Sequence, residues 1–264
     1  MSVGVIGLGY VGLPLTMAFA EAGEQVVAVD LDPRKIAAIA DGESYIEDIP
    51  SDRLQAVLPL IQATSHYQPL ARTDAVLICV PTPLTANREP DLSALTSAGN
   101  ALGQVLQRGQ LVVLESTTYP GTTRERLAPI LEESGLNAGR DFHLAYSPER
   151  VDPGRTDHTI RTTPKVVGGL TDECADRAEA LYRTICDEIV RVSTPEVAEL
   201  SKLLENIFRS VNIALVNELA VLCDRMDIDV WEVVGAAATR CESTSMPITS
   251  WPASANATAS GRPT

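Results

Sequence analysis

A glycine pattern at the start of the sequence constrains the fold of this chain more than any other feature. Gly7, Gly9 and Gly12 give the spacing G-x-G-x-x-G directly after an apolar, β-branched segment at residues 3–6, and residues 13–22 read as a helix. In such a strand–turn–helix unit, the first glycine permits the tight turn, the second lets a diphosphate approach the backbone, and the third lets the helix pack on the strand. The helix N-terminus then offers free N–H groups to the phosphates. The pattern predicts a dinucleotide-binding unit.

The second predicted strand, residues 25–29, ends at Asp30. A carboxylate there accepts hydrogen bonds from an adenosine ribose and repels the 2′-phosphate of NADP, so it predicts NAD as the cofactor. The alternative is a glycine-rich turn followed by an aspartate that caps a helix. Arg34 and Lys35 follow in the next helix, where they lie near the adenosine end of the cofactor or, alternatively, are solvated surface charges.

Strands and helices alternate as far as residue 192. Further strands are predicted at residues 74–80, 111–114, 142–146, 165–167 and 189–192, and further helices at residues 52–61, 91–106, 123–134 and 172–184. This alternation is typical of an α/β fold with a doubly wound, mostly parallel sheet. We expect a Rossmann-like, NAD-binding domain over residues 1–192.

Loops at the carboxyl ends of parallel strands form the ligand site in folds of this kind. The strand at residues 74–80 runs into Pro81-Thr82-Pro83, and the strand at residues 111–114 runs into the hydroxyl-rich segment 115–123. Both segments are therefore candidate ligand loops. For the second, helix capping and turn formation are the alternative.

A long helical region is predicted over residues 193–240. It begins at Ser193-Thr194-Pro195-Glu196, a strong helix start. One apolar stripe follows at helical spacing: Leu200, Leu204, Ile207, Val211 and Ala214. The region is far longer than a typical helix, so we expect either a break around residues 224–229 or a spine that joins domains or subunits. Lys202 and Asn206 share one face, which either reaches into a cleft or faces solvent.

Composition excludes several classes of partner. The formal net charge of −14 argues against nucleic acid and anionic membranes. No stretch approaches the roughly 18 uninterrupted apolar residues of a membrane span, and the N-terminus lacks the basic segment of a signal peptide. The five cysteines are scattered without C-x-x-C spacing, which favours a reducing cytoplasm over disulfides and predicts no zinc or other metal site. Residues 241–264 are rich in Ser, Thr, Ala and Pro, and we expect a disordered tail.

Together these segments resemble the UDP-glucose/GDP-mannose dehydrogenase family. The motifs are GLGYVGLP (7–14), VD (29–30), CVPTP (79–83), ESTTYPGTT (115–123), YSPERVDPG (146–154) and AELSKLLENIFRSVNIALVNELA (198–220). The fourth and fifth look most like members that act on UDP-N-acetylhexosamines. The resemblance implies NAD-dependent oxidation of the C6 alcohol of a UDP-sugar to the carboxylate, with two NAD⁺ reduced in turn, for polysaccharide biosynthesis in the cytoplasm. The apolar stripe of the long helix predicts self-association, as a homodimer that forms through this helix.

Site residues carry over motif by motif. Thr117 and Glu149 would order water near the reacting carbon, with Glu149 as the base of the hydrolytic step, while Lys202 and Asn206 would stabilise the developing oxyanions. With the glycine pattern, the expected cofactor residues are Gly7, Gly9, Tyr10, Val11, Gly12, Asp30, Arg34, Val80, Pro81, Thr82 and Thr117.

The sequence departs from the family after residue 240. The family's nucleophile is a cysteine in a G-G-H-C motif that forms a thiohemiacetal and then a thioester, and this sequence has no such motif. Cys241 lies outside any Gly-rich loop and is not expected to replace it. We therefore expect a truncated or frame-shifted copy, without the family's C-terminal domain and with residues 241–264 as non-family sequence, whose activity is impaired. The alternatives are a catalytically inactive NAD-binding fragment and a single-step β-hydroxyacid-type dehydrogenase.

Overall fold

The computed structural model describes residues 1–150 and 159–239 of the chain. It divides into two compact units, Met1–Leu203 and Leu204–Thr264, and the boundary falls inside the long helix α7 (Pro195–Arg225). Each unit is described by itself. The tail predicted at residues 241–264 lies outside the described residues, as does the part of the YSPERVDPG motif after Arg150.

The first unit is built on one eight-stranded sheet with the order β3-β2-β1-β4-β5-β6-β7-β8. The strands are β1 (Ser2–Ile6), β2 (Gln25–Val29), β3 (Ile61–Thr64), β4 (Ala75–Ile78), β5 (Leu111–Leu114), β6 (His143–Tyr146), β7 (Lys165–Gly169) and β8 (Ile189–Val192). All neighbouring strands are parallel except β6 and β7. The first six strands have the order 3-2-1-4-5-6 of dinucleotide-binding folds, so the predicted α/β fold with a mostly parallel sheet is confirmed.

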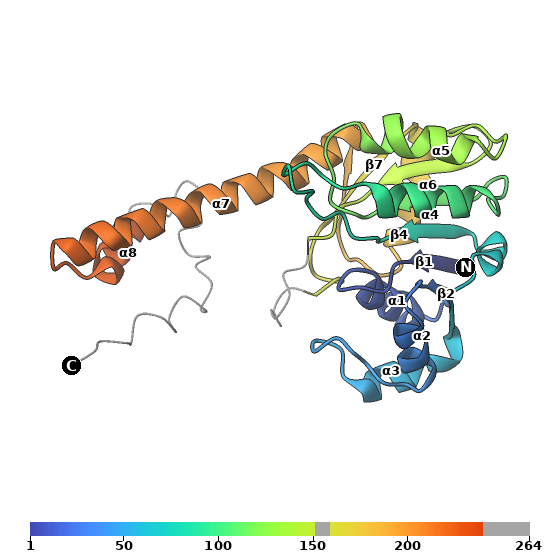
Figure 1. Cartoon of the computed structure of the whole chain (residues 1–264), viewed down its shortest axis with the longest axis horizontal. Coiled ribbons are helices and arrows are strands. Elements are labelled where there is room, and N and C mark those ends of the chain that lie inside the picture. The colour runs from blue at the N-terminus through green and yellow to red at the C-terminus, as the bar shows by residue number, and fades with distance from the viewer. Residues whose placement is uncertain (151–158, 240–264) are drawn as a thin grey trace. The chain divides into compact units, whose positions relative to one another are not determined.

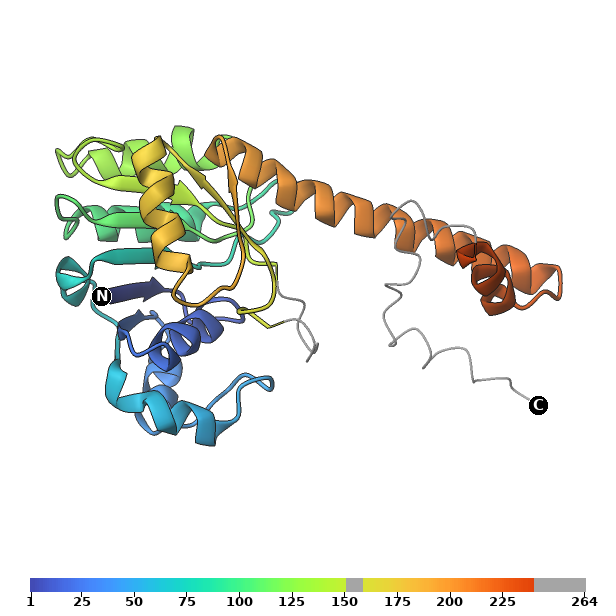
Figure 2. The ribbon, with the colours of Figure 1, turned by 180° about the vertical axis from the view of Figure 1, so that it is seen from behind.

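Helices cover both faces of this sheet, because its strands are apolar on both sides. On β4, for example, Ala75 and Leu77 pack into one core, and Val76 and Ile78 pack into the other. The first core is closed by α1 (Gly12–Glu21), α2 (Pro33–Ala40), α3 (Ser51–Val57) and α6 (Asp172–Tyr182), and the second by α4 (Ser93–Gly103) and α5 (Ala128–Glu132). In the view of Figure 1, α4 and α5 lie in front of the sheet. In the opposite view of Figure 2, α6 lies in front of it.

One predicted element is wrong at its end. The helix predicted over residues 52–61 ends earlier, as α3 and the short helix η1 (Leu58–Leu60), and β3 begins at Ile61. β3 pairs with β2 in the register Val26↔Ile61. It is a partly exposed edge strand of four residues, and its pairing with β2 decides the conformation where the local pattern does not. Two more short helices, η2 (Gln68–Arg72) and η3 (Thr122–Leu127), lie in connections of the sheet.

The second unit contains the remainder of α7 and a shorter helix, α8 (Val230–Ala238). The predicted break is confirmed. α7 ends at Arg225, Asp227 adopts a positive φ of 53°, and the Asp229 carboxylate accepts a hydrogen bond of 2.8 Å from the Trp231 N–H to start α8.

α7 exposes a large apolar surface. Its exposed apolar side chains in the second unit include Leu204, Ile207, Phe208, Val211, Leu215, Leu219 and Leu222. By length and composition alone, α7 could also cross a membrane, since an 18-residue window has a mean hydropathy of 1.3. A single such helix is weak evidence for a membrane protein, because interfaces between soluble subunits expose the same kind of surface before they assemble.

Candidate functional site

The glycine loop after β1 is shaped by close backbone contacts at two of its three glycines. Gly7 has a φ of +92°, and a Cβ on it would lie 2.8 Å from the carbonyl oxygen of Cys79. A Cβ on Gly12 would lie 1.8 Å from the carbonyl oxygen of Gly7, so only glycine lets α1 start against the turn. A Cβ on Gly9 would meet no atom within 4 Å. Gly9 therefore faces open space, as the approach of a diphosphate requires.

Asp30 stands at the end of β2, beside this loop. Its Oδ2 accepts hydrogen bonds of 2.8 Å from the Leu8 N–H and from Nζ of Lys35, and its Oδ1 accepts one of 2.9 Å from the Asp32 N–H. The Tyr45 hydroxyl donates to the carbonyl oxygen of Leu8 at 2.7 Å. These contacts fix a carboxylate where a ribose would lie and fasten the glycine loop to it, so the residues fit the adenosine half of NAD.

A cleft of about 650 Å³ opens over the carboxyl ends of the strands. The expected cofactor residues that line it are Gly7, Gly9, Tyr10, Val11, Asp30, Val80, Pro81, Thr82 and Thr117. Gly12 instead packs beneath the loop. Arg34 is not among the lining residues. Its side chain is 89% exposed and pairs with Asp32 at 2.7 Å, and Lys35 lines the cleft.

The loops after β4 and β5 are tied together at the cleft. The Thr82 hydroxyl donates to the carbonyl oxygen of Thr117 at 2.6 Å, and the Ser116 hydroxyl donates to that of Val80 at 2.6 Å. Thr117 and Glu149 both line the cleft, so the structure brings these two predicted catalytic residues to the cofactor side. Their roles in a reaction stay predictions.

A group of charged side chains lies at the base of the cleft, where Glu115 and Glu149 line it and Lys165 lies behind them. Nζ of Lys165 lies 2.7 Å from Oε2 of Glu115 and 3.4 Å from Oε2 of Glu149, and it lies 5.2 Å from the centre of the Tyr182 ring. The Tyr182 hydroxyl donates to Glu115. Burial raises the pKa of Glu115 even beside Lys165. Burial alone would lower the pKa of Lys165, but Glu115 and Glu149 raise it above its ordinary value. Because its members are far apart in sequence, no local pattern indicated this group.

The start of α7 is fastened to the loop that follows Thr117. The buried carboxylate of Glu199 accepts hydrogen bonds from the Gly121 N–H at 2.6 Å, the Thr123 N–H at 2.8 Å and the Thr123 hydroxyl at 2.7 Å. Burial raises the pKa of Glu199, and these donors oppose the rise. Lys202 follows one turn later in the first unit, whereas Asn206 belongs to the second. The catalytic roles of Lys202 and Asn206 also stay predictions.

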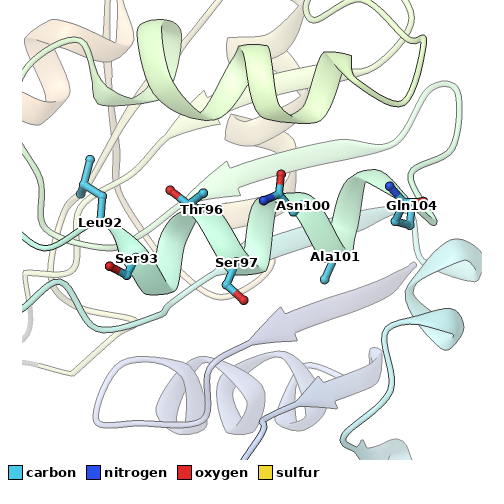
Figure 3. Close-up of a pocket in the computed structure, with 7 residues that line it drawn as sticks. All are labelled: Leu92, Ser93, Thr96, Ser97, Asn100, Ala101 and Gln104. Carbon is cyan, nitrogen blue, oxygen red and sulfur yellow. The ribbon is translucent and has the colours of Figure 1, made fainter.

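A second, shallow depression follows α4 (Figure 3). It is lined by Leu92, Ser93, Thr96, Ser97, Asn100, Ala101 and Gln104, and Ser97 also lines the cleft. The lining has no charged side chain. It offers hydrogen-bonding surface but no group for acid–base or redox chemistry.

The cysteines give no sign of metal chemistry in the part of the chain that the structure describes. Cys79, Cys174, Cys186 and Cys223 are buried free thiols, and no cluster of three or more His, Cys, Asp or Glu side chains could hold a metal ion there. Cys79 lies against the cleft, and burial raises the pKa of its thiol well above the ordinary value. Such a thiol stays protonated and is a poor nucleophile. Cys241 lies outside the described residues.

Comparison with known proteins agrees with this geometry. Residues 1–186 match the NAD binding domain of the UDP-glucose/GDP-mannose dehydrogenase family, and residues 196–252 match its central domain. The chain belongs to the UDP-glucose/GDP-mannose dehydrogenase family. The match to its NAD binding domain makes NAD the cofactor. The central-domain match reaches residue 252, beyond residue 240, so the predicted boundary between family sequence and tail stays a prediction.

Relatives within the family act on UDP-N-acetylhexosamines by name. The chain is 39% identical over 242 residues to UDP-N-acetyl-D-glucosamine 6-dehydrogenase of Pseudomonas aeruginosa, and this match covers 91% of the chain and 57% of that protein. It is 40% identical over 243 residues to UDP-N-acetyl-D-mannosamine dehydrogenase of Pyrococcus horikoshii, with 90% and 58% covered. The chain thus spans little more than half the length of these relatives.

Solved structures of the family superpose well. The UDP-D-ManNAc dehydrogenase of Pyrococcus horikoshii has a TM-score of 0.85 at 40% identity, with 90% of this chain and 58% of that chain covered. A ternary complex of GDP-mannose dehydrogenase from Pseudomonas aeruginosa has a TM-score of 0.86 at 28% identity, with 92% and 57% covered. A 3-hydroxyisobutyrate dehydrogenase from Salmonella typhimurium, at 17% identity and a TM-score of 0.62, shares the fold alone.

Proposed function

We propose that this chain carries out NAD-dependent oxidation of the C6 alcohol of a UDP-N-acetylhexosamine, as a cytoplasmic enzyme of polysaccharide biosynthesis. The observation that carries the proposal is that one cleft is lined by the glycine loop, Asp30, Thr117 and Glu149. The relatives named above support the sugar class, with UDP-N-acetylglucosamine and UDP-N-acetylmannosamine as the two candidates.

Each residue has a distinct task in this proposal. Asp30 and the N–H groups after Gly9 hold the ribose and the diphosphate, and Val80, Pro81 and Thr82 line the nicotinamide side. When bound, NAD⁺ supplies the hydride acceptor. By the family motif, Lys202 and Asn206 are each assigned to stabilise the negative charge that develops as the C6 hydroxyl loses its proton.

The second oxidation needs water at the same carbon. Thr117 and Glu149 are placed to order that water, and an ionised Glu149 takes its proton. Conversion of the alcohol to the carboxylate consumes one water and two NAD⁺ and releases two NADH and three protons. Full oxidation therefore gives two NADH per sugar.

A second candidate function is NAD binding without turnover. It is favoured by one observation, which is that the 264 residues contain no G-G-H-C segment for the covalent intermediate. The two candidates share the cofactor site and differ in chemistry alone.

Incubation of the purified chain with NAD⁺ and each UDP-N-acetylhexosamine separates them. NADH fluorescence and mass spectrometry of the sugar would report two NADH and one uronic acid per sugar if the proposal holds. A Glu149→Gln variant should lose the second oxidation but bind NAD⁺ as the parent does, which makes it the matched control. Calorimetric binding of NAD⁺ with neither NADH nor a new sugar would refute the proposal in favour of the second candidate.

We also propose that the exposed apolar residues of α7 pack against a second copy of the chain. Burial of such side chains stabilises association by about 25 cal/mol per Å² of apolar surface removed from water. Charged substitutions at Leu204 and Val211, both exposed, should raise the dimer dissociation constant at least tenfold in light scattering. A parent chain that stays monomeric at high concentration would refute this.

A further inference from the structure

The one antiparallel step of the sheet brings a lysine to the ligand edge. β6 and β7 pair in the register Ala145↔Gly169 and Tyr146↔Gly168. Continued past the end of β6, this register sets Glu149 opposite Lys165, the first residue of β7. Two contacts follow it beyond the paired residues. The Ser147 hydroxyl donates to the carbonyl oxygen of Val166 at 2.8 Å, and Nη1 of Arg150 donates to that of Pro164 at 2.9 Å.

Both carboxylate oxygens of Glu149 have a donor. Oε2 lies 3.4 Å from Nζ of Lys165, and Oε1 accepts a hydrogen bond of 2.8 Å from the Arg150 N–H. Two donors at different oxygens hold the rotation of the carboxylate as well as its position. The Glu149 side chain is 17% exposed, at the cleft, whereas that of Lys165 is 6% exposed and does not line the cleft. Lys165 can therefore act on a bound substrate through Glu149.

The surroundings keep Lys165 charged. Glu115, with no exposed side-chain surface, is its second anion, and the face of the Tyr182 ring is a further cation-binding surface. In the part of the chain that the structure describes, the other titratable groups that face this cation are the thiols of Cys79 and Cys186 and the phenol of Tyr182, and burial raises the pKa of each. All three groups stay neutral near pH 7. Among the described residues, the carboxylates within 4 Å of the Lys165 ammonium group are those of Glu115 and Glu149.

We propose that Lys165 is a positioning residue that holds Glu149 ionised and correctly oriented as the base of the cleft, with Glu115 as the buried anchor of Lys165. The proposal rests on the role given to Glu149 in the proposed function. A base must be ionised to take a proton, and a half-buried carboxylate next to a second one gains a proton unless a cation offsets both.

Glu149 can be observed directly. In the full chain grown with ¹³Cδ-labelled glutamate, the Glu149 resonance is the one missing from the Glu149→Gln spectrum, and its chemical shift is followed from acid to neutral pH. Lys165→Met removes the charge but keeps the length of the side chain. It should move the Glu149 titration midpoint to higher pH by about one unit or more, the size typical for a lost opposite charge at this distance.

The reverse change tests the anchor. Glu115→Gln removes the competing carboxylate, so the Glu149 midpoint should move to lower pH, opposite to Lys165→Met. A loss of packing alone has no reason to give shifts of opposite sign. Lys165→Arg should restore the parent midpoint to within a few tenths of a unit. Arg183→Met removes a cation from an exposed ion pair with Glu179, and should leave the midpoint unmoved.

The outcomes are decisive even if one variant does not fold. Should Lys165→Met be unstable, the comparison of Glu115→Gln with the double variant Glu115→Gln/Lys165→Met isolates Lys165, and the double variant must titrate at higher pH. An unmoved midpoint in that comparison, or shifts of the same sign in the two single variants, would overturn the proposal. A chain that titrates as expected yet produces no NADH would refute the proposed function and leave the role of Lys165 on Glu149 standing.

Discussion

Two glycine substitutions in the same loop should have opposite effects on stability, although both should weaken the binding of NAD⁺. Gly9→Ala places a methyl group in open space, since no atom lies within 4 Å of it and the backbone of Gly9 is not left-handed. A compatible Gly→Ala change stabilises by about 0.4–1 kcal/mol through the unfolded chain, which corresponds to roughly 1–4 °C in Tm at this size. The same methyl group occupies the path of the diphosphate. Loss of one charge-assisted hydrogen bond costs about 1.5–3 kcal/mol, so NAD⁺ should bind tenfold to hundredfold more weakly.

Gly12→Ala should lower the stability of the fold. Its Cβ would lie 1.8 Å from a carbonyl oxygen, and real Cβ contacts are essentially never under 3.0 Å, so the turn or α1 must move by at least the difference, 1.2 Å. Forced backbone shifts of this kind cost about 3 kcal/mol, or roughly 6–12 °C in Tm. NAD⁺ affinity should fall as well, because the loop that moves is the loop that binds.

Thermal unfolding followed by circular dichroism, together with calorimetric titration of NAD⁺, gives both quantities for both variants. The informative result is that Gly9→Ala should raise the Tm while it weakens the binding of NAD⁺. If Gly9→Ala bound NAD⁺ as tightly as the parent, the diphosphate would not lie against Gly9, and the assignment of the cleft would be wrong. If Gly12→Ala melted with the parent, the close contact with Gly7 would not be a constraint on the fold.

Two further predictions concern charge. Asp30→Asn keeps an acceptor for the Leu8 N–H but removes the negative charge. The affinity for NAD⁺ should fall about tenfold, and the ratio of NAD⁺ to NADP⁺ affinity should become smaller. An unchanged ratio in paired titrations would argue against a ribose at Asp30. Burial lowers the pKa of His143, as does the charge of Arg177, while Glu173 opposes them. At a pH between the two pKa values, His143 is protonated in the unfolded chain and neutral in the folded one. The stability that the neutral imidazole contributes is therefore fully present above the ordinary histidine pKa of about 6.5, and it is lost as the pH falls through the pKa of His143 in the folded chain. The Tm of the parent should therefore drop more between pH 7.5 and 5.5 than that of His143→Gln, with His66→Gln as the exposed control; equal drops would contradict the sign.

The strands of the sheet were predictable because most are apolar on both faces. β1, β4 and β5 lie in buried runs of four or five residues. A short apolar run of this kind, bounded by glycine or proline, is typical of a buried strand. β3 was missed because it lacks such a buried apolar run. It is an edge strand with polar residues, and it owes its conformation to hydrogen bonds with β2, which no window of ten residues contains.

The site was predictable where it consists of local motifs. The glycine loop, Asp30 and the two loops after β4 and β5 each occupy a few consecutive residues, and all reach the cleft. Arg34 and Lys35 show the limit. The sequence offers two adjacent cations, and only the helix orientation decides that Lys35 turns to Asp30 while Arg34 turns to Asp32. The pair of Glu115 and Lys165 spans 50 residues, and only the topology of the sheet brings them together.

The reversed strand β7 has a consequence for how this site tolerates change. Ligand-binding folds usually carry their functional side chains on loops, which drift when insertions accumulate. Lys165 instead is the first residue of strand β7. Its N–H donates a hydrogen bond to the carbonyl oxygen of Glu188 at 3.0 Å, and β7 pairs with β8 from Lys165↔Ile189 onward. Its ammonium group is therefore anchored in the scaffold itself. Surface loops around the cleft can lengthen or be exchanged, while the ammonium group of Lys165 beneath Glu149 stays where it is.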